Sequence, residues 1–223
     1  TGSSAGHVRL YDFDGTSWEQ VGADIDGEAG GDQSGYSVSL SADGSRVAIG
    51  AFLNNGTGSD AGHVRVFEVS SATAQIEVLP NEHIFFAEPD PICENEAPTT
   101  ITPELSFTCS DATPTGGTFS GTGVTDDANG TSFTFDPATA GVGNTTVNYE
   151  LIQQLGLDID GEAGGDQSGW SVSLSADGSR VAIGARLNDG TGSDAGHVRL
   201  YDFDGTSWQQ VGADIDGEAG GDQ

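Results

Sequence analysis

The sequence of this chain repeats itself, and the spacing of the copies constrains the fold more than any other feature. The segment DIDGEAGGDQSG begins at Asp24 and returns unchanged at Asp158, and its first ten residues appear again from Asp214. The segment SVSLSADGSRVAIGA is also present twice, at 37–51 and 171–185. Copies of one supersecondary unit bury a continuous core when they lie side by side, so the sequence predicts a repeat architecture.

The repeat unit is 56 residues long, and one unit is interrupted. The acidic segments at Asp158 and Asp214 are 56 positions apart, whereas those at Asp24 and Asp158 are 134 apart, which leaves 78 additional residues in one unit. These residues fall between GHVRVFEV (62–69) and IQQLGLDIDG (152–161), where the uninterrupted copies have the short segment DFDGTSW. Loop tips tolerate such insertions, because strand partners and domain termini both lie close together. We therefore predict repeats over residues 1–69 and 152–223, and an insert over 70–151.

Each unit has the pattern of four short antiparallel strands. In GYSVSLS, apolar residues alternate with serine, the period of two expected of a half-buried strand. RVAIGA follows after an Asp-Gly turn, and a second Asp-Gly turn separates HVRLYDF from SWEQVGADI. No segment shows helical spacing, so we predict an all-β fold of four-stranded, propeller-type blades. Propellers usually close with four to eight blades, and this chain has fewer than three units. We therefore expect an incomplete propeller, cut from a longer repeat protein.

The segment SGYSVSLSADGSRVAIGA resembles the FG-GAP repeat of integrin-α-like propellers. Ser34-Gly35 and Ser168-Gly169 stand where that repeat has Phe-Gly, and Gly50-Ala51-Phe52 and Gly184-Ala185-Arg186 stand where it has Gly-Ala-Pro. The resemblance covers about two thirds of the chain. It implies β-propeller blades and an extracellular location. The calcium loop that such repeats often carry between their first two strands is reduced here to SADGS, so its ligands have no counterpart in this loop.

Residues 70–151 differ in composition from the repeats. They contain all seven prolines and both cysteines, and their short strand patterns are broken by Gly and Pro turns, which predicts a small β-sandwich. The phrases ICENEAP, GGTFSGTGV and FDPATAGVG are similar to immunoglobulin-like or PKD-like modules of secreted Bacteroidetes proteins. Two origins of this segment remain open: a natural insert in the repeat, or a chimeric join between two unrelated coding segments. Cys93 and Cys109 either form a disulfide, worth about 3 kcal/mol for a loop of about 15 residues, or remain free thiols.

Acidic residues outnumber basic ones by 35 to six, which gives a formal net charge of −29. Nucleic-acid binding needs a clustered positive surface, and an anionic membrane surface would repel such a chain. The sequence also lacks an apolar run of 18 residues, so we expect no membrane insertion.

The acidic loop is the candidate metal site. Calcium takes six to eight oxygen ligands, and each copy of the loop has carboxylates at several alternating positions. The candidate ligands are Asp24, Asp26, Glu28, Asp32, Asp158, Asp160, Glu162, Asp166, Asp214, Asp216, Glu218 and Asp222. The alternative is that these loops are Asp- and Gly-rich turns that join one blade to the next.

One histidine stands before the same strand of each unit, at His7, His63 and His197. A single histidine per unit, with no second histidine or cysteine in phase, favours a structural role over a metal site. No nucleophile elbow, P-loop or dinucleotide fingerprint is present, so we expect no catalytic residues and no enzyme activity.

These features favour a non-catalytic segment of a secreted or cell-surface bacterial protein. Its expected role is adhesion or interaction with proteins or glycans on a surface, and its other expected partners are further repeats of the same parent chain. Two alternatives remain: an accessory region of a larger secreted enzyme, or a purely structural stalk. A fold of this kind hosts many functions and does not separate them.

Overall fold

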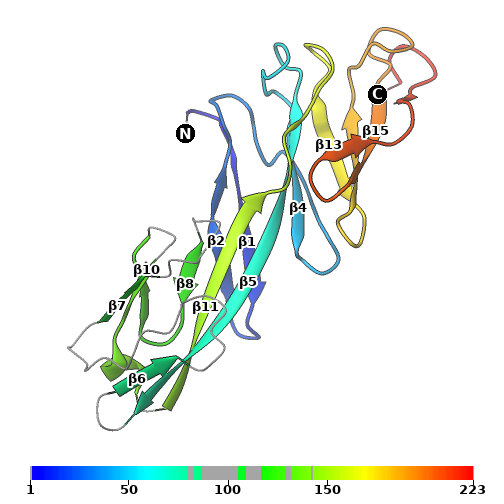
Figure 1. Cartoon of the computed structure of the whole chain (residues 1–223). Coiled ribbons are helices and arrows are strands. Elements are labelled where there is room, and N and C mark those ends of the chain that lie inside the picture. Colours follow the sequence, from blue (N-terminus) through cyan, green and yellow to red (C-terminus); the bar gives the residue numbers. More distant parts are fainter. Residues whose placement is uncertain are drawn as a thin grey trace. The chain divides into compact units, whose positions relative to one another are not determined.

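The computed structural model describes residues 2–79, 83–86, 105–108, 117–128, 132–141 and 143–222. Almost every regular element in this part of the chain is a strand (Figure 1). The elements are β1 (His7–Phe13), β2 (Trp18–Asp26), β3 (Ser37–Leu40), β4 (Arg46–Ala51), β5 (His63–Leu79), β6 (His83–Phe86), β7 (Leu105–Thr108), β8 (Thr118–Ser120), β9 (Val124–Asp126), β10 (Ser132–Phe135), α1 (Pro137–Ala140), β11 (Gly143–Gln154), β12 (Ile159–Asp160), β13 (Ser168–Leu174), β14 (Arg180–Ala185), β15 (His197–Phe203), β16 (Trp208–Gln210) and β17 (Ile215–Asp216).

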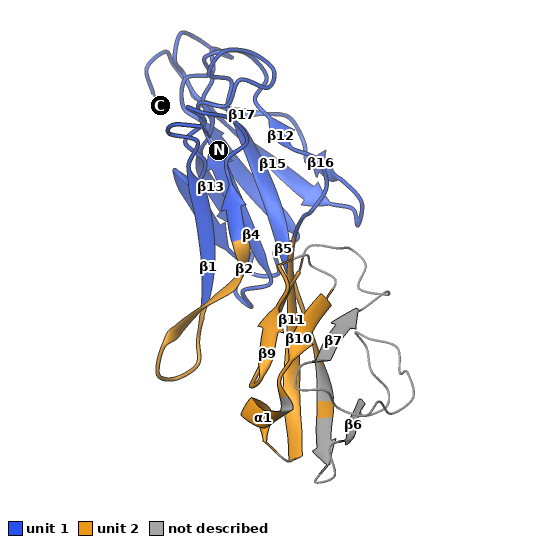
Figure 2. Cartoon of the chain, turned by 90° about the vertical axis from the view of Figure 1, so that its left-hand side faces the viewer, with its two compact units in different colours: residues 1–11, 24–69, 153–223 blue, residues 12–23, 70–152 orange. Residues whose placement is uncertain are grey.

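The chain forms two compact units, coloured separately in Figure 2. Unit 1 comprises Thr1–Tyr11, Asp24–Val69 and Gln153–Gln223. Unit 2 comprises Asp12–Ala23 and Ser70–Ile152, and therefore contains the segment that the sequence marks as an insert. Within the described residues, no helix is long and apolar enough to cross a membrane.

The second repeat, residues 168–216, is an antiparallel sheet in unit 1. Its strands follow the order β13-β14-β15-β16, and β17 pairs with β15 beyond the end of β16. The pairs Val172↔Ile183 and Ile183↔Arg199 fix the register of the first three strands. The turn before β14 contains Gly178, whose positive φ of 66° suits glycine. This sheet confirms the prediction of an all-β fold with propeller-like blades.

The first repeat comprises residues 34–69 and 152–160, which correspond to 168–216, and it has the same strands. Its fourth strand is reached only after the insert. β3, β4 and β5 are neighbours in one antiparallel sheet, and β5 is also a neighbour of β11. After β11, the N–H of Leu155 donates to the carbonyl of Val66 at 2.7 Å, and Ile159 in β12 pairs with Val64. The chain thus leaves the sheet along β5 and returns beside it along β11, which is consistent with an insertion in a hairpin turn.

The two repeats pack face to face through one shared apolar cluster. Ala48, Val64, Val66 and Ile159 of the first repeat form a buried cluster with Val181, Ile183 and Tyr201 of the second. Backbone groups also meet across the junction: Ser37 Oγ donates to the carbonyl of Gly169 at 2.7 Å. A Cβ on Gly50 would lie 2.1 Å from that same oxygen, so this close approach requires glycine.

Unit 2 contains a three-stranded sheet in the order β7-β10-β9, and β8 pairs with β11. Three buried or nearly buried rings hold these strands together: Phe119 lies 5.1 Å from Phe133 and 4.8 Å from Tyr149, measured between ring centroids. The short helix α1 begins after Asp136, whose carboxylate accepts from the N–H of Ala138. Cys93 and Cys109 lie outside the described residues, and the immunoglobulin-like resemblance of this unit stays a prediction.

Candidate functional site

Two clusters of one histidine and two carboxylates lie at the repeat junctions in unit 1. The first cluster is Glu28, His63 and Asp158, and the second is Glu162, His197 and Asp214. In each cluster, one potential ligand atom from each residue lies within 4.8 Å of the others. The histidine begins the third strand of a repeat, the aspartate follows the fourth strand, and the glutamate comes from the preceding acidic loop.

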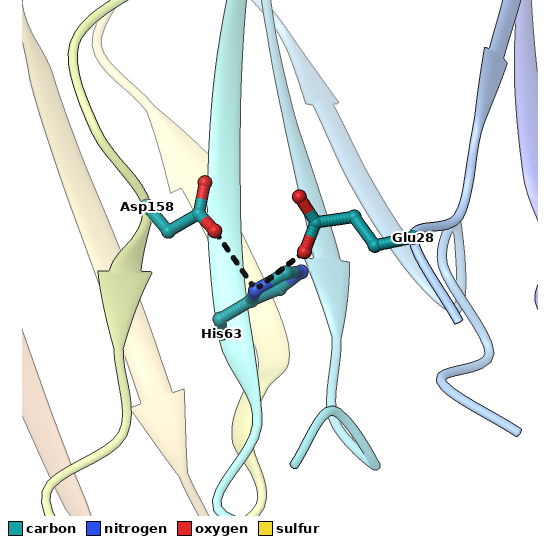
Figure 3. A group of neighbouring side chains, drawn as sticks. All are labelled: Glu28, His63 and Asp158. Carbon is teal, nitrogen blue, oxygen red and sulfur yellow. Dashed lines mark ion pairs between the residues drawn. The ribbon is translucent and has the colours of Figure 1, made fainter. Parts of the chain in front are cut away.

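The first cluster surrounds the imidazole of His63 (Figure 3). His63 Nδ1 lies 3.8 Å from Glu28 Oε2 and 3.6 Å from Asp158 Oδ2. The histidine side chain is 2% exposed, whereas the glutamate and aspartate side chains are 44% and 30% exposed. Both separations exceed hydrogen-bonding distance. The two carboxylates therefore face a buried nitrogen across a gap that opens towards solvent.

The second cluster reproduces this geometry with residues in equivalent positions. His197 Nδ1 lies 3.9 Å from Glu162 Oε2 and 3.8 Å from Asp214 Oδ2. The His197 side chain is 1% exposed, and among the described residues neither of its ring nitrogens has a hydrogen-bond partner. A buried polar group left in this state costs roughly 1–3 kcal/mol.

The second oxygen of each carboxylate is held by another side chain. Asp158 Oδ1 accepts from Gln154 Nε2 at 2.6 Å, and Glu28 Oε1 lies 3.8 Å from Arg65 Nη1. The Arg65 guanidinium is itself fixed, because its Nη2 donates to the backbone carbonyl of Asp26 at 2.7 Å. Gln210 and Arg199 make the equivalent contacts in the second cluster. These contacts leave one oxygen of each carboxylate directed at the histidine.

Burial is the main influence on the protonation of His63. It lowers the pKa of the imidazole, while the nearby charge of Asp158 acts in the opposite direction and is the weaker effect. The neutral imidazole that results carries a nitrogen lone pair, which is the form that binds metal ions.

The third histidine in phase, His7, does not share this environment. His7 is exposed, and among the described residues no cluster of acidic groups forms around it. Asp24, the counterpart of Asp158, instead forms a two-hydrogen-bond ion pair with Arg9, with both bonds at 2.8 Å. The cluster therefore requires the glutamate of a preceding acidic loop as well as the residues of its own repeat.

The other carboxylates that the sequence marks as candidate ligands lie elsewhere. Asp32 is buried, and its Oδ2 accepts from the N–H of Ala29 and from Asn54 Nδ2. Asp166 does the same in the next loop, and Asp222 accepts from the N–H of Ala219. The side chains of Asp26, Asp160, Asp216 and Glu218 are exposed. The structure thus groups carboxylates of two successive loops around a histidine, and does not gather the four carboxylates of one loop.

Sequence reasoning assigned the three histidines a structural role and did not place any of them beside the acidic loops. The available signal was the position in the repeat. Each histidine occurs at the same position of its unit, and so does each acidic loop. That signal does not say which loop supplies each carboxylate, because the answer depends on how the repeats stack.

In each SADGS loop, the aspartate accepts hydrogen bonds from other groups of the same loop. Asp43 Oδ1 accepts from the hydroxyls of Ser41 and Ser45 and from the N–H of Ser45, and these hydrogen bonds lower the pKa of Asp43 to about 2. The equivalent contacts lower the pKa of Asp177 to about 2 as well. Serine groups of the same loop therefore hold each of these aspartates in place.

Comparison with known families identifies a repeat within unit 1. Residues 157–201 match the FG-GAP repeat, and this range contains Asp158, Glu162 and His197 of the two clusters. No curated protein and no solved structure gives a significant match to the chain. The match confirms the FG-GAP resemblance for this part of the second repeat and its preceding loop.

Proposed function

We propose that this chain is a non-catalytic, propeller-type segment of a secreted or cell-surface protein that serves adhesion or the binding of proteins or glycans. The observation that carries the proposal is the FG-GAP match at 157–201, within a pair of repeats that stack through one shared core. Such repeats form a non-catalytic scaffold.

Exposed apolar side chains on one face of the second repeat support the proposal that a further repeat docks there. Val198 is 38% exposed, but its counterpart Val64 is fully buried by the second repeat. Ile215 is 57% exposed, whereas its counterpart Ile159 is 5% exposed. A pocket of about 470 Å³ opens on this face, lined among others by Trp170, Val198 and Ile215. Since the first repeat buries the same positions in its junction, this pocket matches the docking face for another repeat.

The face of the first repeat that lies away from the second repeat also exposes apolar side chains. Val38 and Leu40 on β3 are each 54% exposed. Their counterparts Val172 and Leu174 on β13 pack against the core between the two repeats. An apolar strand face of this size, with a buried equivalent in the same chain, supports docking of a preceding repeat.

An aromatic ladder at the junction supports a role in ligand binding. Tyr36 lies 4.5 Å from Phe52 and 4.7 Å from Trp170 between ring centroids. The guanidinium of Arg186 lies over the Trp170 ring at 3.7 Å. Tyrosine, tryptophan and arginine are the residues most enriched at binding hot spots, and aromatic rings also stack on sugar rings.

Binding is tested by applying the purified chain to immobilised glycans and to extracted surface proteins. We expect saturable binding that Tyr36→Ala and Arg186→Gln each weaken at least about tenfold, a loss of about 1.4 kcal/mol. Glu19→Gln, which changes an exposed carboxylate of unit 2, should bind as the unmodified chain does. Absence of saturable binding would favour the stalk, and turnover of a bound glycan would contradict a non-catalytic role.

The proposal includes calcium binding by the acidic loops, as the sequence predicts. The bound ion would stabilise the folded chain. An ion that binds only the folded state raises the melting temperature. We expect a rise on titration with calcium chloride, measured by circular dichroism against magnesium chloride at equal ionic strength. An equal response to both salts would indicate screening of the net charge, and would remove calcium from the proposal.

A further inference from the structure

We propose that each repeat junction binds one divalent transition-metal ion, with zinc as its representative, through a histidine and two carboxylates from successive acidic loops. The sites are the two clusters Glu28–His63–Asp158 and Glu162–His197–Asp214. This inference does not depend on the adhesive function, because it concerns how the repeats are held together.

The buried histidine is the observation that points to a ligand. His197 is almost completely buried at the base of its cluster, and both of its ring nitrogens lack hydrogen-bond partners. Its Nδ1 faces two carboxylate oxygens that lie too far away to accept a hydrogen bond. Buried polar groups in native proteins normally have partners, and an unplaced ion is one accepted reason for an exception.

The separations in the clusters fit a small ion with little adjustment. Metal–nitrogen and metal–oxygen bonds to zinc are about 2.0–2.2 Å, so two ligand atoms of a tetrahedral ion lie about 3.4 Å apart. The distances from histidine nitrogen to carboxylate oxygen are 3.6 and 3.8 Å in the first cluster and 3.8 and 3.9 Å in the second. The two carboxylate oxygens of each cluster lie within 4.8 Å of each other. Because both side chains are partly exposed, they can move towards the ion, and their exposure gives the ion a path from solvent.

The ligand types select the class of ion. Calcium prefers six to eight oxygen ligands, whereas an imidazole nitrogen suits zinc, copper, nickel and iron. A neutral histidine with two carboxylates also balances the charge of one divalent ion. Gln154 and Arg65 hold the far oxygens of Asp158 and Glu28, which is how outer groups orient metal ligands.

The ion would join parts of the chain that are distant in sequence. Glu28 belongs to the acidic loop before the first repeat, and Asp158 belongs to the loop after the insert. An ion held by both closes the interrupted repeat around its histidine. Because the unfolded chain does not hold these ligands together, binding stabilises the folded state.

The test is isothermal titration of the full chain with zinc chloride at neutral pH in a buffer that does not bind metals. We expect two ions per chain at the strongest sites, and a higher melting temperature with zinc than after treatment with a chelator. His197→Gln should leave one strong site, and the double variant His63→Gln/His197→Gln should leave none. His7→Gln is the matched control, since His7 has the same sequence context without a cluster, and it should retain two.

A second pair of variants covers the case in which the histidine variants fail to fold. Glu28→Gln and Glu162→Gln change exposed carboxylates, so their circular dichroism should match that of the unmodified chain, and each should weaken one strong site at least tenfold. Two strong sites in the double histidine variant, or a loss of one in His7→Gln, would overturn the proposal. It would equally be overturned by the absence of zinc binding, or by displacement of zinc with an equal concentration of calcium.

Discussion

At the scale of single residues, identical side chains make different contacts according to what lies on either side of their repeat. Arg65 reaches the backbone carbonyl of Asp26, and Arg199 reaches that of Asp160, both at 2.7 Å. Arg9, in the same phase, pairs instead with the carboxylate of Asp24. The local sequence is the same, so the neighbouring acidic loop decides the partner.

The aspartates of the SADGS loops should make stability depend on pH in the acid range. The pKa of Asp43 and of Asp177 is lowered from 3.8 to about 2 by hydrogen bonds in the folded loop. A carboxylate with a lowered pKa stabilises the fold above its unfolded pKa, and this contribution is lost as the pH falls towards the folded pKa. The double variant Asp43→Asn/Asp177→Asn should therefore melt lower at neutral pH and lose less stability between about pH 4 and pH 2.

The measurement is the melting temperature at a series of pH values, followed by circular dichroism. Glu218→Gln serves as the control, because it removes an exposed carboxylate outside these loops. The same acid dependence in the double variant and in the unmodified chain would contradict this prediction.

Trp208 should contribute more to stability than its counterpart Trp18. Trp208 Nε1 donates to the carbonyl of Leu155 at 2.8 Å, whereas Trp18 is 69% exposed. Phenylalanine keeps an aromatic ring but leaves the Leu155 oxygen without this donor, at a cost of about 1 kcal/mol. Trp208→Phe should lower the free energy of unfolding in urea by about that amount, and Trp18→Phe should leave it nearly unchanged. Equal losses in the two variants would show that the hydrogen bond is unimportant.

At the scale of elements, the alternation of apolar residues and the Asp-Gly turns predicted most strands of the repeats. β3, β4, β13, β14 and β15 lie where that pattern places them. The fourth-strand segment SWEQVGADI forms one strand, β2, as predicted, whereas its copy SWQQVGADI divides into β16 and β17. Gly22 within β2 and Gly212 between β16 and β17 both have a positive φ, of 62° and 75°. β5 and β11 also continue further than the repeat pattern indicates, because each can keep its backbone hydrogen bonds with the other as the chain enters and leaves the insert.

Gly50 and Gly184 provide a test of repeat packing with matched sequence. A Cβ on Gly50 would meet the backbone oxygen of Gly169 at 2.1 Å, whereas one on Gly184 would meet the Ser171 hydroxyl at 2.4 Å, which a side-chain rotation can relieve. Gly50→Ala should cost about 1–3 kcal/mol, the usual cost of overpacking. For a chain of this length, each kcal/mol corresponds to about 2–4 °C in melting temperature.

Thermal melting of both alanine variants decides this prediction. Gly184→Ala should melt well above Gly50→Ala, because the backbone oxygen of Ser171 lies 3.8 Å from a Cβ on Gly184, which is an ordinary van der Waals contact. If both variants lose the same stability, then the strand itself requires glycine and the junction does not.

At the scale of the whole molecule, the insert should be dispensable for the repeats. Residues 70–151 occupy the position of Asp204–Ser207 in the second repeat, where four residues close the hairpin between β15 and β16. We expect a variant with Asp-Gly-Thr-Ser in place of 70–151 to keep the sheets of unit 1, since short Asp-Gly loops favour hairpins.

Hydrogen exchange on residues 168–216 and the cooperativity of thermal melting measure the outcome. Protection of β13, β14 and β15 should match that in the full chain, and the shortened chain should melt in a single transition. Loss of protection in these strands would mean that the insert is required to fold the repeats.

The sequence by itself determined the spacing of the copies and the all-β strands, and it predicts the place of the insert, because these depend on local alternation, turn residues and identity between copies. Only the tertiary structure decided that Glu28 and Asp158 meet at His63, and that Asp32 is instead buried as a hydrogen-bond acceptor. Glu28 and Asp158 stand in loops of the same composition, with the whole insert between them in the chain. Side-chain contacts between stacked sheets depend on which faces pack together, and the residue pattern of a single strand does not determine this packing.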